Sequence, residues 1–349
     1  MGTIRPLGDG SCRGDTQWSP RDRAGTGTCI HDPYQDIREP RLGEGIACSA
    51  RISDVAYERT VAAVRELIAE AHENGAEQII VFGTEVFRRA ENGKEVAFKL
   101  GEAIGFEIKI LTSEEEARYS FIGGISGLPE PDGRCRAEYN VIIDVGGGST
   151  EIAFGRVTLE HFNSLPIGAV VLAESCGAFP PISSSKQKIL FGKIEEELDK
   201  LSSIIQGKSS LQGGRGEACL ARVSNVEIAS AYDPAMTSRT ERFIGIGGTI
   251  TTLAALREQT MEYRGDEVHG VMLTRSWLEG IFQELVGLND TEIARMIPFA
   301  PARAKILPAG TAVFLSVMER LGADELIVSD RGARWGMLLS LYSAPKSHS

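Results

Sequence analysis

The stretch that most constrains the fold of this chain is residues 140–151, Asn-Val-Ile-Ile-Asp-Val-Gly-Gly-Gly-Ser-Thr-Glu. Its β-branched apolar start predicts a short buried strand that ends at Asp144. Glycine has no Cβ and tolerates positive φ, so the glycines that follow, Gly146, Gly147 and Gly148, can form a turn whose backbone N–H groups approach a phosphate. The alternative is a flexible hairpin with a chance carboxylate. The apolar residues 152–154 favour a strand, a phosphate loop and a second strand.

The side chains around these glycines predict a metal site. Ser149 and Thr150 add hydroxyl groups to the loop. Asp144 and Glu151 supply hard oxygen ligands of the kind that hold Mg²⁺ against a phosphate, directly or through water. We therefore predict that Asp144 and Glu151 bind Mg²⁺ or another divalent cation.

Composition excludes several classes of protein. The chain has 349 residues, which suffices for two domains with full cores. Its 37 basic and 48 acidic residues give a net charge of −11, which argues against a general nucleic-acid or membrane surface. No apolar run approaches the roughly 20 residues of a membrane span, and the N-terminus lacks a signal-peptide core, so we expect a cytoplasmic protein. The six cysteines form no Cys-x-x-Cys pair and are expected to be reduced thiols.

Strands and helices alternate along the chain, which indicates an α/β fold. Residues 1–40 have the composition of a loop or a frayed terminus, and residues 129–133 form a plausible linker. We accordingly predict domains at 1–128 and 129–349, with the last helices packing back on the first domain. Strands are expected at 78–82, 106–111, 140–143, 152–154, 243–246 and 325–329, and helices at 53–74, 94–104, 112–124, 184–205, 274–288, 291–296, 303–321 and 332–341.

A second glycine turn follows the strand at residues 243–246. Gly247, Gly248 and Thr249 lie where a helix begins, so they offer a second phosphate cradle. The turn is neither a dinucleotide fingerprint, because Ile250 stands where the third glycine is required, nor a Walker loop, because no Gly-Lys-Ser or Gly-Lys-Thr follows. Two such loops predict a cleft in which both approach one phosphorylated ligand.

The motifs together resemble those of the exopolyphosphatase / guanosine pentaphosphate phosphohydrolase (Ppx/GppA) family. The resemblance covers residues 41–339 and rests on eight segments in this order: 41–45, 84–92, 113–118, 144–151, 164–170, 247–249, 268–270 and 329–332. It implies an actin-like ATPase (ribonuclease H-like) fold with two domains flanking an interdomain cleft, in the short form without the additional helical domain of longer members.

The resemblance also implies roles for residues whose function the sequence pattern alone does not determine. Acidic residues in the first turn of a helix are favoured by the helix dipole without any catalytic role. The family places its proposed general base at the position of Glu116. It places a phosphate contact at Arg88, with Asn92 one helical turn later, although a lone arginine on a helix more often faces solvent. Gly248 and Thr249 are expected to bind a farther phosphate. His269 is expected to be structural.

The N-terminus departs from the family pattern. Members normally begin with a strand and an Asp-x-Gly-Ser/Thr-Asn-Ser loop, whereas residues 1–7, Met-Gly-Thr-Ile-Arg-Pro-Leu, resemble only the tail of that motif. Either the start has been placed too late or the chain has lost a phosphate loop, and with it activity. The sequence leaves both explanations open.

Three functions remain in view. The leading hypothesis is a Mg²⁺-dependent phosphoanhydride hydrolase that releases terminal phosphate from inorganic polyphosphate, or converts guanosine pentaphosphate to the tetraphosphate. The first alternative is a catalytically impaired sensor that binds polyphosphate or an alarmone. The second is a sugar or acetate kinase of the same fold, which the segments at 41–45 and 113–118 disfavour. A homodimer is expected from the family alone.

Overall fold

The computed structural model describes residues 38–343, except residues 39, 77, 130–138 and 210–240. The chain forms two compact units: the first contains the residues up to Tyr119 and those from Ala333 onward, and the second is Ser120–Gly332. The division differs from the predicted boundary after residue 128 and places the last helix with the first unit. Residues 1–37 and 39 of the predicted N-terminal loop, and residues 130–133 of the predicted linker, lie outside the described residues.

The first unit is a small α/β layer built on two short parallel strands. β1 (Val81–Gly83) pairs with β2 (Ile108–Ile110). Ser53 caps the longest helix of the unit by accepting a hydrogen bond from the N–H of Ala56. The apolar residues of the helix α4 (Gly93–Ile104) recur on one face and are buried, at Val96, Ala97, Leu100 and Ile104. The helices are α1 (Ile46–Ser49), α2 (Asp54–Glu73), α3 (Glu85–Arg89), α4 (Gly93–Ile104), the start of α5 (Ser113–Ile125) and α14 (Ala333–Ser343).

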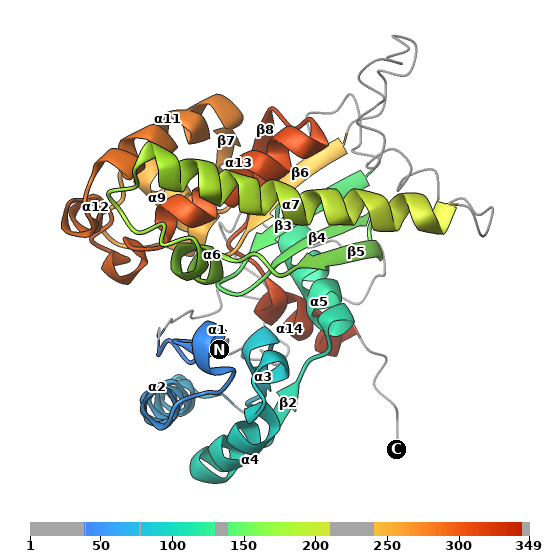
Figure 1. Cartoon of the computed structure of the whole chain (residues 1–349). Coiled ribbons are helices and arrows are strands. Elements are labelled where there is room, and N and C mark those ends of the chain that lie inside the picture. The colour runs from blue at the N-terminus through green and yellow to red at the C-terminus, as the bar shows by residue number, and fades with distance from the viewer. Residues whose placement is uncertain (1–37, 39, 77, 130–138, 210–240, 344–349) are drawn as a thin grey trace. The chain divides into compact units, whose positions relative to one another are not determined.

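The second unit is organised around a six-stranded sheet in the order β5-β4-β3-β6-β8-β7 (Figure 1). β3, β6 and β8 run parallel, whereas β4, β5 and β7 are antiparallel to their neighbours. The strands are β3 (Tyr139–Val145), β4 (Thr150–Gly155), β5 (Leu159–Leu165), β6 (Glu241–Ile246), β7 (Met272–Thr274) and β8 (Glu325–Val328).

The side chains of a strand alternate between the two faces of a sheet, and the central strand β3 has buried side chains on both faces. Val141, Ile143 and Val145 of β3 belong to the large core, whereas Ile142 belongs to a smaller cluster with Phe121 of α5. On the large-core face, α7 (Ser184–Ser209) packs against β5 and α13 (Leu307–Leu321) packs against β3. The helices of this unit are the end of α5, α6 (Ala169–Ser175), α7 (Ser184–Ser209), α9 (Gly248–Arg257), α10 (Gly265–Val268), α11 (Arg275–Gly287), α12 (Asp290–Met296) and α13 (Leu307–Leu321).

The structure corrects several predicted elements. β5 and β7 were not predicted, and β1 is shorter than the strand expected at 78–82. The helix expected from residue 303 begins at Leu307, because Pro301–Arg303 forms a separate 3₁₀ turn. Pro308 in the first turn of α13 suits a helix start, since the N–H that proline lacks would have no partner there.

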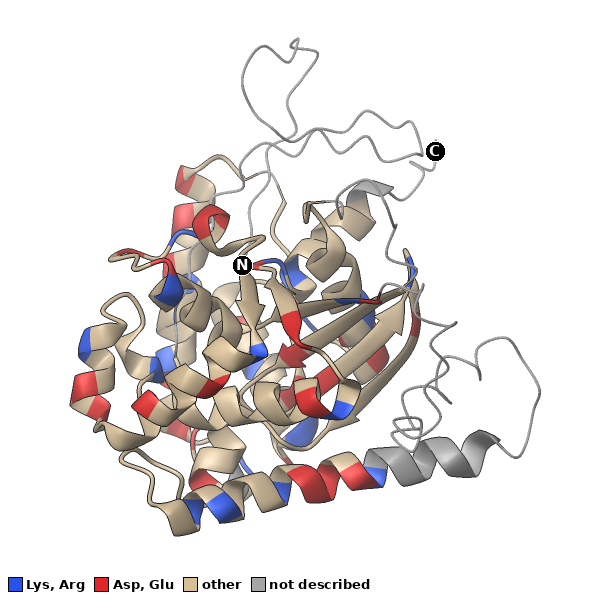
Figure 2. Ribbon diagram, turned by 90° about the horizontal axis from the view of Figure 1, so that it is seen from above, with Lys and Arg blue, Asp and Glu red and all other residues tan. Residues whose placement is uncertain are grey.

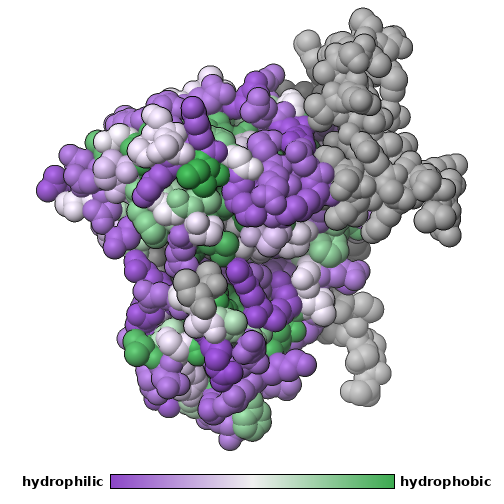
Figure 3. All heavy atoms as spheres, viewed as in Figure 1, coloured by the Kyte–Doolittle hydropathy of each residue, from purple (hydrophilic) through white to green (hydrophobic). Residues whose placement is uncertain are grey.

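The surface carries charges of both signs. Lys193 and Lys200 of α7 pair with Glu196 and Glu197 one turn away, and charged residues of either sign recur along that helix (Figure 2). The face drawn in Figure 3 is mostly hydrophilic, with scattered apolar residues. Within the described part of the chain, no helix is both long and apolar enough to cross a membrane.

The glycine turn after β3 is held by the segment that leads into α6. The N–H groups of Ala169 and Val170 donate to the carbonyl oxygens of Gly146 and Gly147, each at 2.9 Å. Gly168 lies so close that a Cβ there would stand 2.4 Å from the carbonyl carbon and oxygen of Gly147. Only glycine therefore fits at position 168 without moving the turn.

His269 is half-buried and lies near the end of β8. Its Nδ1 lies 3.4 Å from the hydroxyl oxygen of Ser329, which follows β8 directly. Burial lowers the pKa of His269 to about 4, and the positive charge of Arg331 acts in the same direction. The structure thus supports the expected structural role, with a neutral imidazole at neutral pH.

We predict that Gly168→Ala lowers the free energy of unfolding by about 2–3 kcal/mol, because the new methyl group overlaps the backbone of the glycine turn. Urea denaturation measures the loss. Gly192→Ala is the matched control, since α7 leaves open space at that position and alanine favours a helix. A loss of stability no greater for Gly168→Ala than for Gly192→Ala would contradict the close approach.

We also predict that His269 makes the protein less stable in mild acid. Because its pKa in the folded chain is lowered, its stabilising effect is complete above the unfolded pKa and is lost as the pH falls from about 6.5 to about 4. Between pH 8 and pH 5 the loss is about 2 kcal/mol. Urea denaturation should therefore show a smaller decrease in stability over this range for His269→Gln than for the unmodified chain. Equal decreases would disprove this role.

Candidate active site

The carboxyl ends of the parallel strands gather the predicted phosphate-binding residues of the second unit. β3 and β6 are neighbours, and their register pairs Asp144 with Ile246. Gly247 therefore follows β6 directly beside the end of β3. It has a φ of 93°, and a Cβ there would lie 3.0 Å from Oδ1 of Asp144. The two glycine turns that are far apart in sequence are thus adjacent in the fold, at the edge where α/β sheets bind ligands.

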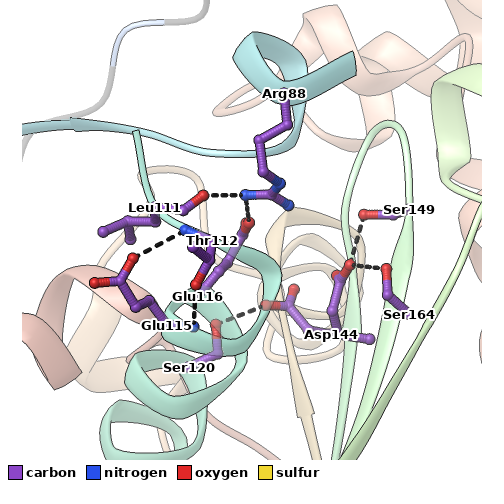
Figure 4. A network of polar contacts seen from close by, with 10 residues as sticks. Arg88, Leu111, Thr112, Glu115, Glu116, Ser120, Asp144, Ser149 and Ser164 are labelled. Atoms are coloured by element: carbon purple, nitrogen blue, oxygen red, sulfur yellow. Dashed lines mark hydrogen bonds and ion pairs between the residues drawn. The ribbon is translucent and has the colours of Figure 1, made fainter. Parts of the chain in front are cut away.

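The two predicted metal ligands stand opposite each other on the β3–β4 hairpin. The register pairs Asp144 with Glu151, and directly opposed residues of antiparallel strands have Cβ atoms about 5 Å apart. Glu151 is buried, and its Oε1 accepts hydrogen bonds from the hydroxyls of Ser149 at 2.7 Å and Ser164 at 2.8 Å (Figure 4). Oδ2 of Asp144 accepts one from Ser120 at 3.1 Å. Hydrogen bonds from hydroxyl groups thus reach both carboxylates.

This donor set fits Mg²⁺. Mg²⁺ in proteins usually keeps several water ligands and takes one or two carboxylates together with substrate phosphates. Two opposed carboxylates beside a glycine turn match that description. Among the described residues, no group of three or more His, Cys, Asp and Glu side chains could enclose a metal ion. With two carboxylates from the protein, water and substrate phosphate oxygens would supply the other ligands of the ion.

The first glycine turn differs in its backbone from the prediction. None of Gly146, Gly147 and Gly148 has a positive φ, so left-handed backbone is not the reason for glycine there. A side chain at Gly147 would instead crowd Val170 of α6, with 3.3 Å from its Cβ to Cγ2. Among the described residues, the N–H groups of Gly147 and Gly148 donate no hydrogen bond, and they remain suitable donors for a phosphate. Ser149 turns its hydroxyl toward Glu151.

The second glycine turn contains a residue that sequence reasoning missed. A Cβ at Gly248 would lie 1.7 Å from Nη1 of Arg303, so this guanidinium lies against the start of α9. The sequence gives no indication that Arg303 lies near this turn, because the two segments approach each other only when the chain folds. Thr249 is 4% exposed, and its side chain packs on Gly310 of α13. Because the side chain of Thr249 is packed in this way, its backbone N–H at the start of α9 is the group that could bind a phosphate.

The three consecutive glutamates at the start of α5 have different contacts and different exposure. Glu115 accepts a hydrogen bond from the N–H of Thr112, and the hydroxyl of Thr112 accepts one from the N–H of Glu115. This reciprocal pair is a capping box. Glu115 also pairs with Lys109, whose hydrogen bond lowers the pKa of the carboxyl. Glu114 is exposed. The helix cap thus explains Glu115 without chemistry, and Glu116 is the least exposed of the three glutamates.

Glu116 is held inside the first unit by Arg88. Nη1 of Arg88 lies 2.7 Å from Oε2 of Glu116 and donates to the carbonyl oxygen of Leu111 at 2.8 Å (Figure 4). Burial raises the pKa of Glu116, and the hydrogen bond and charge of Arg88 offset the rise only in part. A carboxylate whose pKa is raised is a better proton acceptor at neutral pH than an exposed glutamate.

Asn92 does not lie one helical turn beyond Arg88. α3 ends at Arg89, Ala90 is extended, and Asn92 precedes α4 as its N-cap residue. Its side-chain amide bonds the backbone of Ile52 twice, with Oδ1 accepting from the N–H and Nδ2 donating to the carbonyl, each at 2.9 Å. The structure gives Asn92 a role in joining two loops, and its phosphate contact stays a prediction.

A pocket of about 420 Å³ opens beside Arg88 in the first unit. Its cations are Arg88 and Lys94, and the rest of its lining is Phe87, Ala90, Glu91, Ile110, Leu111 and Thr112. The first unit thus brings together Glu116, Arg88 and this pocket, while the second brings together the carboxylate pair and the glycine turns. The predicted cleft that would join the two sets stays a prediction.

Comparisons with known proteins identify similarity to one family. The model of the Ppx/GppA phosphatase family matches residues 22–228 and 222–344. The chain is 28% identical over 322 residues to "Exopolyphosphatase 2" of Mycobacterium tuberculosis, covering 89% of this chain and 90% of that protein. It is 23% identical over 305 residues to "Guanosine-5′-triphosphate,3′-diphosphate pyrophosphatase" of Aeromonas hydrophila, covering 87% of this chain and 53% of that protein.

Solved structures share the fold. The crystal structure of an Aquifex aeolicus Ppx/GppA family member has a TM-score of 0.65 and 27% identity, and the match covers 92% of each chain. An exopolyphosphatase from Cytophaga hutchinsonii has a TM-score of 0.72, with 93% of this chain and 94% of that one covered; at 16% identity it shows the fold alone. These likenesses confirm the predicted fold class. The family predicted from the motifs is confirmed as well: this chain belongs to the Ppx/GppA phosphatase family.

Proposed function

We propose that the chain is a divalent-metal-dependent phosphohydrolase that releases the terminal phosphoryl group of a phosphoanhydride chain. Membership of the Ppx/GppA phosphatase family supports this reaction class. The names of similar proteins, an exopolyphosphatase and a guanosine-5′-triphosphate,3′-diphosphate pyrophosphatase, support inorganic polyphosphate or guanosine pentaphosphate as the substrate.

The observation that carries the proposal is the largely enclosed, arginine-bound Glu116, whose side chain is 17% exposed. A general base works best when its pKa lies near the working pH, and burial moves the pKa of this carboxyl in that direction. We propose that Glu116 orients a water molecule and accepts its proton as the water oxygen attacks the terminal phosphorus. The bond to the bridging oxygen breaks, and that oxygen leaves as part of a stable phosphate anion.

Arg88 is proposed to serve both the base and the phosphate. Its two hydrogen bonds among the described residues, to Glu116 and Leu111, both come from Nη1. The guanidinium has five N–H donors in a planar fork that matches phosphate geometry, so its other donors suit a phosphoryl oxygen. In this position Arg88 would bring the phosphoryl group toward the carboxylate that activates the water.

The second unit is proposed to bind the phosphate chain. The N–H groups of Gly147, Gly148, Gly248 and Thr249 and the guanidinium of Arg303 are the donors, and Asp144 and Glu151 are the ligands proposed for Mg²⁺. When bound there, Mg²⁺ withdraws charge from the phosphoryl oxygens. The carboxylates and the donors all lie at one edge of the sheet, so together they can fix the orientation of the chain end.

We predict that Glu116→Gln lowers kcat for phosphate release about 10²- to 10⁴-fold, because the amide cannot accept the proton of the water. The assay measures phosphate released from long-chain polyphosphate and from guanosine pentaphosphate, each with Mg²⁺ and with EDTA. Glu114→Gln is the matched control, an exposed glutamate on the same turn of α5. Unchanged release by Glu116→Gln would remove this residue from the mechanism. No release by the unmodified chain would favour the sensor.

We further predict that Arg88→Gln moves the acid limb of the kcat/KM profile to higher pH. The guanidinium favours the ionised carboxylate, so its loss raises the pKa of Glu116 further and leaves the base protonated at higher pH. Arg88→Lys retains the positive charge and should move the limb less. The measurement is the initial rate across pH at low substrate concentration. An acid limb that does not move in Arg88→Gln would show that Glu116 is not the titrating base.

A further inference from the structure

The hydroxyl of Ser120 makes an unusual contact for a serine inside a helix. Serine and threonine in helices commonly donate to a carbonyl oxygen one turn earlier. Thr60, Thr311 and Ser340 of this chain do so, to the carbonyl oxygens of Ala56, Leu307 and Gly336. Ser120 instead donates to Oδ2 of Asp144 on β3, at 3.1 Å (Figure 4). This hydroxyl therefore leaves its own helix to reach a residue proposed to bind metal.

The surroundings of Ser120 hold this contact in place. Ser120 is 2% exposed, and its neighbour Phe121 is fully buried against the sheet. One turn later, a Cβ at Gly124 would lie 2.7 Å from Cδ1 of Ile142 on β3, so helix and strand approach very closely there. The backbone that carries Ser120 is thus fixed against the strand that carries Asp144. A short side chain between two fixed backbones can determine the orientation of the carboxylate.

We propose that Ser120 is a positioning residue whose hydrogen bond orients the carboxylate of Asp144 for a divalent cation. Outer hydrogen bonds to a metal-binding group set its orientation and alter metal affinity, commonly by 10- to 100-fold. For Glu151 the corresponding contacts come from Ser149 in the glycine turn and from Ser164 on the neighbouring strand β5. Ser120 differs because it comes from α5, the helix that also carries Glu116 four residues earlier. The inference depends on the proposed metal-binding role of Asp144.

The direct test is the affinity of the purified full chain for Mn²⁺ without substrate. Free Mn²⁺ is measured by electron paramagnetic resonance during a titration, and Mg²⁺ competition gives the affinity for Mg²⁺. We expect Ser120→Ala to bind Mn²⁺ about tenfold more weakly. Ser120→Thr, which keeps the hydroxyl, should restore most of the affinity. The matched control is Ser126→Ala, because the hydroxyl of Ser126 donates to the carbonyl oxygen of Gly123 within its own helix region and, among the described residues, does not reach Asp144.

A double-mutant cycle with Asp144→Asn separates positioning from a general loss of stability. If Ser120 acts through Asp144, then Ser120→Ala weakens Mn²⁺ binding in the unmodified chain and causes no further weakening in Asp144→Asn. The cycle does not use Ser120→Thr, so it still tests the role of Ser120 if the additional methyl group of threonine disturbs the packing. Equal weakening in both backgrounds, or unchanged Mn²⁺ affinity in Ser120→Ala, would overturn the proposal.

The same titration distinguishes this inference from the proposed function. Phosphate release by the unmodified chain together with unaltered Mn²⁺ affinity in Ser120→Ala rejects Ser120 alone. Weakened Mn²⁺ binding in Ser120→Ala, with no phosphate release from either substrate by the unmodified chain, supports Ser120 and rejects the proposed hydrolase activity. Absence of Mn²⁺ binding by the unmodified chain overturns the metal role of Asp144 and the inference with it.

Discussion

The pairing of β3 with its two neighbours is the constraint on which the second unit depends. Its antiparallel ladder with β4 sets Asp144 opposite Glu151, and its parallel ladder with β6 sets Asp144 beside the second glycine turn. A shift of either ladder by one residue would turn these side chains to the other face of the sheet. The alternation of β3 between two buried clusters opposes such a shift, because every displaced side chain would leave its core.

In the first unit, two opposing effects act on one carboxyl group. Burial of Glu116 disfavours its charge, and Arg88 restores part of the stability of the ionised form. Without burial, Glu116 would be an ordinary exposed carboxylate. Without Arg88, its charge would be enclosed and unpaired. The neighbouring Glu115, which shares the same helical turn, is used for the capping box and for Lys109. Position on the helix therefore decides which acidic side chain is available for chemistry.

Part of the candidate site was readable in the sequence because it is local. The hairpin from Asp144 to Glu151 contains its strand, turn and carboxylates within one short segment, so their spacing already implies their pairing. Arg303, Ser120 and Ser164 were not identified as site residues, because each reaches the site from a separate element through contacts that no spacing encodes. For Asn92 the prediction from spacing is wrong: Asn92 does not follow Arg88 on one helix, because the chain is extended at Ala90.

The sequence by itself determined the α/β class, most of the long helices, the two glycine turns and the family, since these follow from periodicity and from motifs of contiguous residues. The tertiary structure decided which residues of those motifs serve the fold and which are left for chemistry. It paired Glu116 with Arg88, turned Ser149 toward Glu151, and packed Thr249 on Gly310. The physical reason is that burial and hydrogen bonding depend on segments distant in sequence, whose approach only the folded chain defines.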